Sequence, residues 1–200
     1  MGEAILLKII EDPDAGKVAT EGVYTGTTVY YCTKNGNYRI TCVGGGQGGA
    51  GSYVTITGSY GTQVRGSYGG VSGQVVSNIV ALKADTSYVI TVGAGGERGE
   101  DDYRNWYSGN GGITSFGSLM SSSGGFTALN NGRNGGALYI NEQTGYVQNT
   151  VTSIPLSYGN GGQGSRWYTY TDRWGDEMVE YYNDSTNGSN GCVIVNYVGK

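Results

Sequence analysis

Histidine is absent from this 200-residue sequence, and cysteine, proline and charged residues are scarce. Without histidine, neither a Ser-His-Asp nor a Cys-His nucleophile can form, and the commonest metal ligand is missing. The three cysteines are an odd number with no CxxC spacing, which indicates neither a disulfide framework nor a zinc site. Charged residues make up 14% of the chain, against the usual share of about 25%.

Catalysis would have to rely on carboxylates. The pair Asp101 and Asp102, or the acids within residues 176–180, could in principle serve a glycosidase, which needs two carboxyl groups at a controlled separation. Neighbouring acids on one insert more often solvate a loop, so we expect no enzyme and no catalytic residue. Residues 100–102 lack the spaced oxygen ligands of a calcium loop, and we expect no metal and no cofactor.

Basic clusters and long apolar runs are also missing. With a net charge of −4 and no long Lys/Arg cluster, the chain has no surface suited to a phosphate backbone, so we expect no nucleic-acid partner. No stretch reaches 18 consecutive apolar residues, which predicts no membrane insertion. The apolar run Ala4–Ile10 lacks the basic start and cleavage site of a signal peptide, so we expect assembly in the cytoplasm.

What the sequence has in abundance is glycine, with 39 residues, and tyrosine, with 18. Helical periodicity is hard to find, whereas alternating β-branched and tyrosine residues recur between glycine-rich breaks, which predicts an all-β fold. Val29–Lys34 and Asn37–Val43 flank an Asn-Gly pair that suits a type I′ turn, and we expect a hairpin there. Further strands are expected at four places, which are Tyr53–Thr57, Gln74–Leu82, Ser87–Val92 and Cys192–Val198.

The chain is long enough for one sizeable domain and short for two. We therefore expect a single glycine-rich β domain over residues 27–200. Residues 1–26 are less patterned, with a turn at Asp12-Pro13-Asp14, and are predicted to form an N-terminal arm or attachment segment.

Glycine clusters occur from residue 44 to residue 191, spread along the chain. A glycine run inside a strand weakens it, so the clusters need a compensating role. One such role is close lateral packing of polyproline-II-like backbones, in which only glycine fits; flexible loops are the alternative. If the clusters pack, Gly45→Val and Gly161→Val should destabilise the protein strongly.

Five glycine-containing motifs follow one another in a fixed order. They are Gly36-Asn37-Tyr38-Arg39-Ile40-Thr41-Cys42-Val43-Gly44-Gly45-Gly46, Tyr88-Val89-Ile90-Thr91-Val92-Gly93-Ala94-Gly95-Gly96, Gly111-Gly112-Ile113-Thr114-Ser115-Phe116-Gly117, Tyr158-Gly159-Asn160-Gly161-Gly162-Gln163-Gly164 and Gly191-Cys192-Val193-Ile194-Val195-Asn196-Tyr197. Over about residues 28–198 this order resembles the glycine-rich domain of tailed-bacteriophage tail-fibre proteins and distal adhesins.

The resemblance implies a β-sandwich base, glycine-rich segments bundled as polyglycine-II helices, and variable distal loops that contact a host receptor. It also implies a place in the virion tail, with the rest of the tail fibre and a bacterial surface receptor as partners. Tail fibres are commonly trimeric, while some distal adhesins are single chains on a trimeric shaft, and the sequence leaves both open. Cys42 and Cys192 stand where the family usually carries Val or Ile, so we expect buried, reduced thiols.

Two inserts rich in aromatic residues interrupt the glycine pattern and contain all three tryptophans. Tyr and Trp give large contact area at low entropic cost, and Arg and Asn add directional hydrogen bonds, as in binding loops. We expect both inserts to be loops that bind the receptor. The candidate residues are Tyr103, Arg104, Asn105, Trp106, Tyr107, Arg166, Trp167, Tyr168, Tyr170, Arg173 and Trp174.

Other interpretations stay open. The tryptophans could instead cover the glycine bundle or a subunit interface, and Tyr60–Tyr68 and Tyr181–Asn183 are weaker binding candidates. The sequence thus favours a receptor-binding domain for a bacterial surface glycan or protein. A structural or adhesive glycine-rich scaffold is the alternative, and an enzyme that degrades surface polymers is a more distant one.

Overall fold

A computed structural model describes residues 14–56, 62–66, 69–100, 107–126, 157–182 and 185–200 of the chain. Within these ranges there is no α-helix, which confirms the all-β class. The strands are β1 (Gly22–Tyr24), β2 (Thr28–Cys32), β3 (Gly36–Val43), β4 (Ser52–Ile56), β5 (Thr62–Gly66), β6 (Val75–Leu82), β7 (Thr86–Thr91), β8 (Thr114–Phe116), β9 (Met120–Ser122), β10 (Arg166–Thr171), β11 (Glu177–Tyr182) and β12 (Cys192–Gly199).

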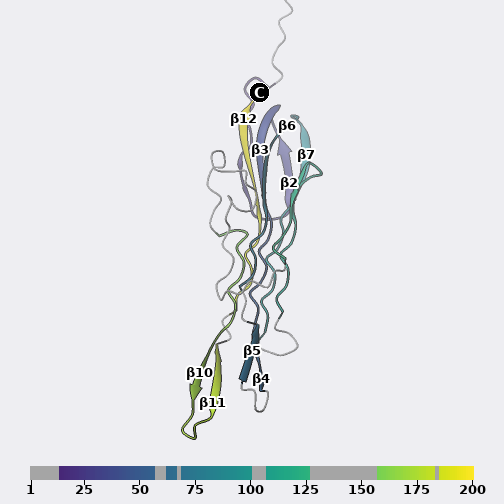
Figure 1. The fold of residues 1–200 in the computed structure, drawn as a ribbon. Helices are drawn as coiled ribbons and strands as arrows, with labels where there is room; N and C mark the ends of the chain where they lie inside the picture. Colours follow the sequence, from purple (N-terminus) through teal and green to yellow (C-terminus); the bar gives the residue numbers. More distant parts are fainter. Residues whose placement is uncertain (1–13, 57–61, 67–68, 101–106, 127–156, 183–184) are drawn as a thin grey trace, which may run out of the picture.

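Two four-stranded antiparallel sheets form a sandwich at the end of the molecule that holds the C-terminus (Figure 1). One sheet has the order β1-β12-β3-β6 and the other β2-β7-β8-β9. The four strands expected from alternation, at residues 53–57, 74–82, 87–92 and 192–198, correspond to β4, β6, β7 and β12. The short strand β1 lies within residues 1–26 and pairs with β12 as an edge strand of the first sheet.

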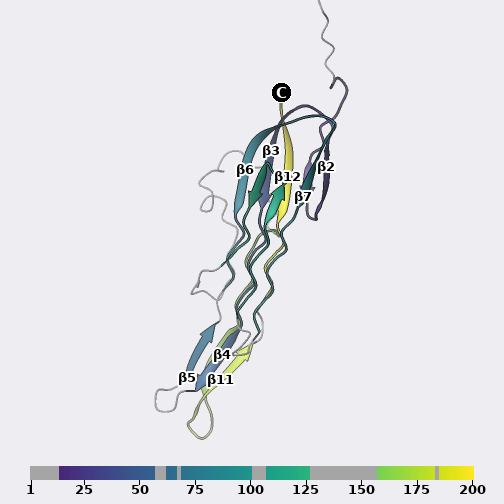
Figure 2. The ribbon, with the colours of Figure 1, turned by 90° about the vertical axis from the view of Figure 1, so that its right-hand side faces the viewer.

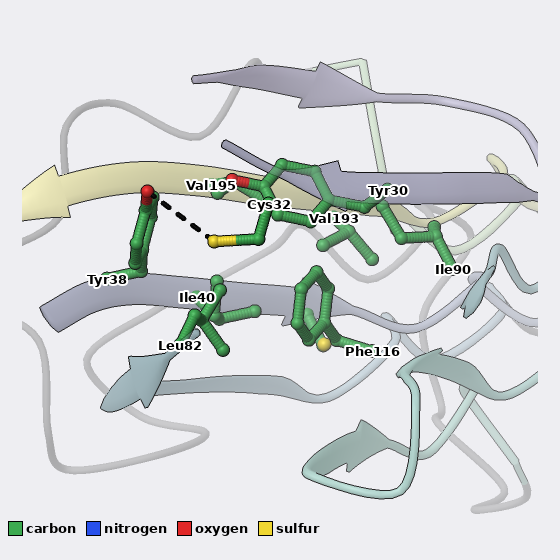
Figure 3. Packing of buried hydrophobic residues seen from close by; sticks show 10 residues of the cluster. Tyr30, Cys32, Tyr38, Ile40, Leu82, Ile90, Phe116, Val193 and Val195 are labelled. Carbon is green, nitrogen blue, oxygen red and sulfur yellow. Dashed lines mark hydrogen bonds between the residues drawn. The ribbon is translucent and has the colours of Figure 1, made fainter. Parts of the chain in front are cut away.

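The sandwich core fills the space between the two sheets (Figure 3). Tyr30, Ile90 and Phe116 enter it from one sheet, and Tyr38 and Ile40 enter from the other. The Phe116 ring lies 5.5 Å from the Tyr30 ring, centroid to centroid. The buried Tyr38 hydroxyl donates to the Lys34 carbonyl at 2.8 Å, so its polar end is satisfied as burial requires.

The expected hairpin around Asn35-Gly36 is wrong. β2 pairs with β7, while β3 pairs with β12 and β6, so the chain crosses here from one sheet to the other. The Asn35 side chain is used for this crossing: its Nδ2 donates to Asp14 Oδ2 at 2.7 Å and its Oδ1 accepts from the Ala84 N–H at 2.9 Å. Asn35 also lacks the positive φ that a type I′ turn requires.

Below the sandwich, seven extended segments of the described chain run side by side and form the glycine bundle (Figures 1 and 2). These segments are residues 44–51, 70–74, 93–100, 109–113, 123–126, 159–165 and 186–191. Their backbone hydrogen bonds join different segments and repeat every third residue. For example, the N–H groups of Gly45 and Gly48 both donate to segment 109–113. This is the spacing expected of a polyproline-II-type chain with three residues per turn.

Segment 44–51 is the centre of the bundle and has all six other segments as hydrogen-bonded neighbours. Its N–H groups donate to segments 70–74, 109–113 and 186–191, and its carbonyls accept from segments 93–100, 123–126 and 159–165. Around this centre the order is 70–74, 159–165, 186–191, 93–100, 109–113, 123–126, and every adjacent pair in that ring shares a backbone hydrogen bond, the last pair with the first included. Around the ring, segments that accept hydrogen bonds from segment 44–51 alternate with segments that donate hydrogen bonds to it.

Glycine is required in the central segment because the neighbouring backbones leave no room for a side chain. A Cβ at Gly45 would lie 2.1 Å from the Ala94 carbonyl oxygen, and one at Gly46 would lie 1.9 Å from the Asn160 oxygen. Gln47 and Ala50 are the exceptions, and they follow Gly44 at intervals of three residues. A Cβ at Gly44 would meet the Ser123 carbonyl. The side chains of Gln47 and Ala50 are both buried, and the Gln47 Oε1 accepts a hydrogen bond from the Val71 N–H at 3.2 Å.

Cys42 and Cys192 are buried and form no disulfide, as expected. They lie on the paired strands β3 and β12 but on opposite faces of the sheet: Cys42 belongs to the sandwich core, and Cys192 packs with Val43 and Val75. Burial raises the pKa of each thiol to about 12, with the nearby Cys192 adding to the effect on Cys42.

A first prediction concerns the central segment. Gly45→Ala should destabilise the protein by more than about 3 kcal/mol, because its Cβ would overlap a backbone carbonyl that cannot move aside. Gly26→Ala is the matched control, since a Cβ there meets nothing within 4 Å, and it should change stability by less than about 0.5 kcal/mol. The measurement is denaturant unfolding, and equal stabilities of the two variants would contradict the packed bundle.

A second prediction concerns Cys42 and Cys192. Both pKa values lie above that of an unfolded thiol, so the neutral thiols favour the folded state fully below about pH 8.5, and this stabilisation is lost as pH rises toward 12. A water-soluble thiol reagent at pH 8 should therefore modify them only as fast as the protein unfolds. Labelling followed by mass spectrometry, with and without denaturant, checks this. Rapid labelling of the native protein would contradict it.

Candidate functional site

The attachment points of three inserts lie at one level, at the end of the glycine bundle opposite the sandwich (Figures 1 and 2). They follow Gly51, Glu100 and Ser165. The Ser165 N–H donates to the Ala50 carbonyl at 3.0 Å, and a Cβ on Gly51 would lie 2.0 Å from the Glu100 oxygen. The chain thus brings the attachment points of the two aromatic inserts to the same end of the bundle, and that of a third insert lies beside them.

Two of the inserts form β-hairpins that extend beyond the bundle. β4 pairs with β5, and β10 pairs with β11 in an unbroken antiparallel register from Arg166–Tyr182 to Thr171–Glu177. The expectation that residues 166–174 form a loop is therefore wrong in part, because residues 166–171 are a strand. Alternating aromatic and threonine residues suit a strand, and the partner strand, residues 177–182, was not recognised from the sequence.

The turn between β10 and β11 is fixed by Asp172. Its Oδ1 accepts hydrogen bonds from the Trp174 and Asp176 N–H groups, both at 2.9 Å, and its own N–H donates to the Asp176 carbonyl at 2.9 Å. Gly175 has a φ of +89°, which a side chain would strain. An Asp that accepts from the backbone two residues on is a well-known way to hold a turn. The apex is therefore ordered before any ligand arrives.

The apex presents an aromatic ring and a cation to solvent. The Trp174 side chain is 72% exposed, and the Arg173 guanidinium lies 3.9 Å from the centroid of its ring. A guanidinium at that distance is held by cation–π attraction. Tyr170 and Met178, which pair across the hairpin, are also exposed, so large side chains continue from the apex along the strands. Met178 was not among the sequence candidates, because its role depends on the hairpin register.

The structure describes some of the remaining candidate residues, and others lie outside the described ranges. Tyr107 is exposed at the end of its insert. Arg166, Trp167 and Tyr168 lie on β10. The candidates Tyr103, Arg104, Asn105 and Trp106 lie outside the described residues. Of the weaker candidates, residues 62–66 form β5 and residues 181–182 end β11, while Tyr60, Tyr68 and Asn183 lie outside the described part.

The chemistry of this end is that of a contact surface. Among the residues that the structure describes, no three His, Cys, Asp or Glu side chains come together as a metal site. The same residues include no helix that is long and apolar enough to cross a bilayer. What the hairpin offers is an exposed ring, a stacked cation and a turn held by four hydrogen bonds, those of Asp172 and one from the Gly175 N–H to the Asp172 carbonyl at 3.1 Å.

Comparison with known proteins gives one family. A family model described as a glycine-rich domain matches residues 20–190. This span includes every sandwich strand except β12, all but the last residue of the glycine bundle and both hairpins. No curated protein matches the chain.

A third prediction tests the apex. Asp172→Ala removes the acceptor of two backbone N–H groups, so the amides of Trp174 and Asp176 should exchange with solvent about tenfold faster, while global stability changes by less than about 1 kcal/mol. Asp172→Asn keeps the Oδ1 acceptor and should leave exchange near the unmodified rate. Amide exchange followed by nuclear magnetic resonance distinguishes the two variants. Equal exchange in both would show that Asp172 does not hold the turn.

Proposed function

This chain belongs to the glycine-rich domain family, and we propose that it is the receptor-binding (adhesin) domain of a bacteriophage tail fibre. In this proposal the hairpin end recognises a glycan or protein on the bacterial surface, and the sandwich end joins the rest of the fibre. The chain acts by binding, without catalysis and without a cofactor, and its place is the virion tail.

The observation that carries the proposal is the exposed Trp174 on an ordered turn. An exposed tryptophan offers a large rigid apolar surface that a partner can bury, and single aromatic anchors supply much of the energy of many interfaces. Because the turn is held before binding, little entropy is lost when Trp174 becomes buried. Its exposure also argues against the alternative in which this tryptophan covers the bundle.

The separation of the glycine bundle from the two hairpins supports the same proposal. The bundle admits almost no sequence change at its centre, since a Cβ there meets backbone atoms, whereas the hairpins pair only within themselves. A rigid stem that carries separately folded inserts allows recognition residues to change without disturbing the core. The C-terminus lies at the opposite end, away from the hairpins (Figure 1). Asp14 lies at the sandwich too, where it accepts a hydrogen bond from Asn35 between β2 and β3.

A fourth prediction tests this function. Trp174→Ala should weaken adsorption of the labelled domain to susceptible bacteria about 30-fold, which corresponds to about 2 kcal/mol, while the free energy of unfolding changes by less than about 1 kcal/mol. Loss of an anchor affects binding alone, because Trp174 contributes no buried contact to the core. Binding isotherms and thermal melts are measured on the same preparations.

The control is Tyr31→Ala, which removes another exposed aromatic residue, 51% exposed, at the sandwich end. Its adsorption should equal that of the unmodified domain. Normal adsorption of Trp174→Ala would rule out the hairpin apex as the receptor contact. Failure of the unmodified domain to adsorb to any strain would contradict the receptor-binding function itself, and loss of surface polymer in the same assay would favour an enzyme.

A further inference from the structure

At one part of the rim of the glycine bundle, backbone donors are paired with side-chain oxygens. In segment 93–100, the N–H groups of Gly96 and Gly99 donate inward to the carbonyls of Gly46 and Gly49. The N–H groups of Gly95 and Arg98, also three residues apart, receive side-chain acceptors instead. This second row of donors lies along one edge of the bundle.

Two asparagines of the adjacent segment supply those acceptors. Asn190 Oδ1 accepts from the Gly95 N–H and Asn187 Oδ1 accepts from the Arg98 N–H, each at 2.8 Å. The asparagines are three residues apart, like the donors, so one side chain serves each turn of the neighbouring chain. Both side chains are exposed, which places them on the outside of the bundle. Their amide oxygens stand where the carbonyls of one more glycine-rich segment would stand.

An edge of this kind favours addition of another chain. In β-sheets, a row of unpaired N–H and C=O groups invites pairing with a second molecule, and natural proteins block such edges. A row of N–H groups spaced by three residues matches the carbonyls of any chain with three residues per turn. The described part of the protein includes seven such segments, so a second copy is the nearest suitable partner.

We propose that Asn187 and Asn190 close this edge of the glycine bundle against lateral association with a second copy of the chain. The inference stands apart from the receptor-binding proposal, because it rests on the bundle and not on the hairpins. Asparagine suits the role, since its amide oxygen replaces a backbone carbonyl while its bulk prevents a further backbone from approaching. Glycine at both positions would keep the three-residue repeat and leave the edge open.

A fifth prediction follows for the double variant Asn187→Gly/Asn190→Gly. Its sedimentation coefficient should rise with protein concentration, whereas that of the unmodified protein should not, because two backbone donors become available to a second molecule. The amides of Gly95 and Arg98 should exchange about fivefold to tenfold faster in dilute solution, where each has lost one hydrogen bond. Sedimentation velocity and amide exchange provide the two measurements.

Two controls separate edge closure from ordinary stabilisation. Asn110→Gly changes another exposed asparagine of the bundle and should cause neither effect. Asn187→Asp/Asn190→Asp keeps both acceptor oxygens and should restore slow exchange and concentration-independent sedimentation, measured in about 1 M salt so that added charge is screened beyond about 3 Å.

The single variants Asn187→Gly and Asn190→Gly should show intermediate association, and they provide the test if the double variant does not fold. Sedimentation of the glycine variants that stays independent of concentration would overturn the proposal, even if exchange becomes faster. Association of the aspartate variant equal to that of the glycine variant would also overturn it.

Discussion

The enclosure of segment 44–51 by six neighbouring backbones is the constraint on which the rest of the structure depends. Each backbone hydrogen bond of the centre requires a neighbour at contact distance, and at that distance a Cβ on Gly45 or Gly48 would overlap a carbonyl group. The same geometry extends outward, since a Cβ at Gly111 or Gly188 would meet the central backbone. Apart from the buried Gln47 and Ala50, the central segment has no room for side chains, and the large inserts lie beyond the bundle.

A bundle of this kind needs an anchor. Glycine loses more conformational entropy on folding than any other residue, and the segments that meet in the bundle are far apart in the chain. The sandwich compensates for both costs. Strands β3, β6 and β12 fix the register of the three bundle segments to which they are joined. The core around Tyr30, Tyr38 and Phe116 buries apolar surface, which glycine cannot supply. The hydrogen bonds then extend an order that the strands have set.

The sequence predicted those parts of the fold that depend on local pattern. Alternation located β6, β7 and β12, and composition indicated the all-β class. The prediction failed at Asn35-Gly36, where the local signal for a turn was outweighed by contacts of the Asn35 side chain with Asp14 and Ala84, distant residues that no local pattern reveals. A three-residue period is present in Gln47 and Ala50, and in Asn160 and Gln163, but it differs from the periods of 2 and 3.6 residues that identify strands and helices.

The candidate site was predictable in composition and not in shape. Clustered Trp, Tyr and Arg identified the insert at residues 166–174. The sequence did not predict that its apex is ordered, because that order depends on the pairing with β11 and on the hydrogen bonds that Asp172 accepts. The same holds for the rim: the asparagines of segment 186–191 look like ordinary surface residues until their oxygens are placed against Gly95 and Arg98. In both cases a side-chain oxygen accepts a hydrogen bond from a backbone N–H. Polar side chains thus satisfy backbone donors at the rim of the bundle and order the apex of the hairpin, where Trp174 is exposed to solvent with the Arg173 guanidinium over its ring.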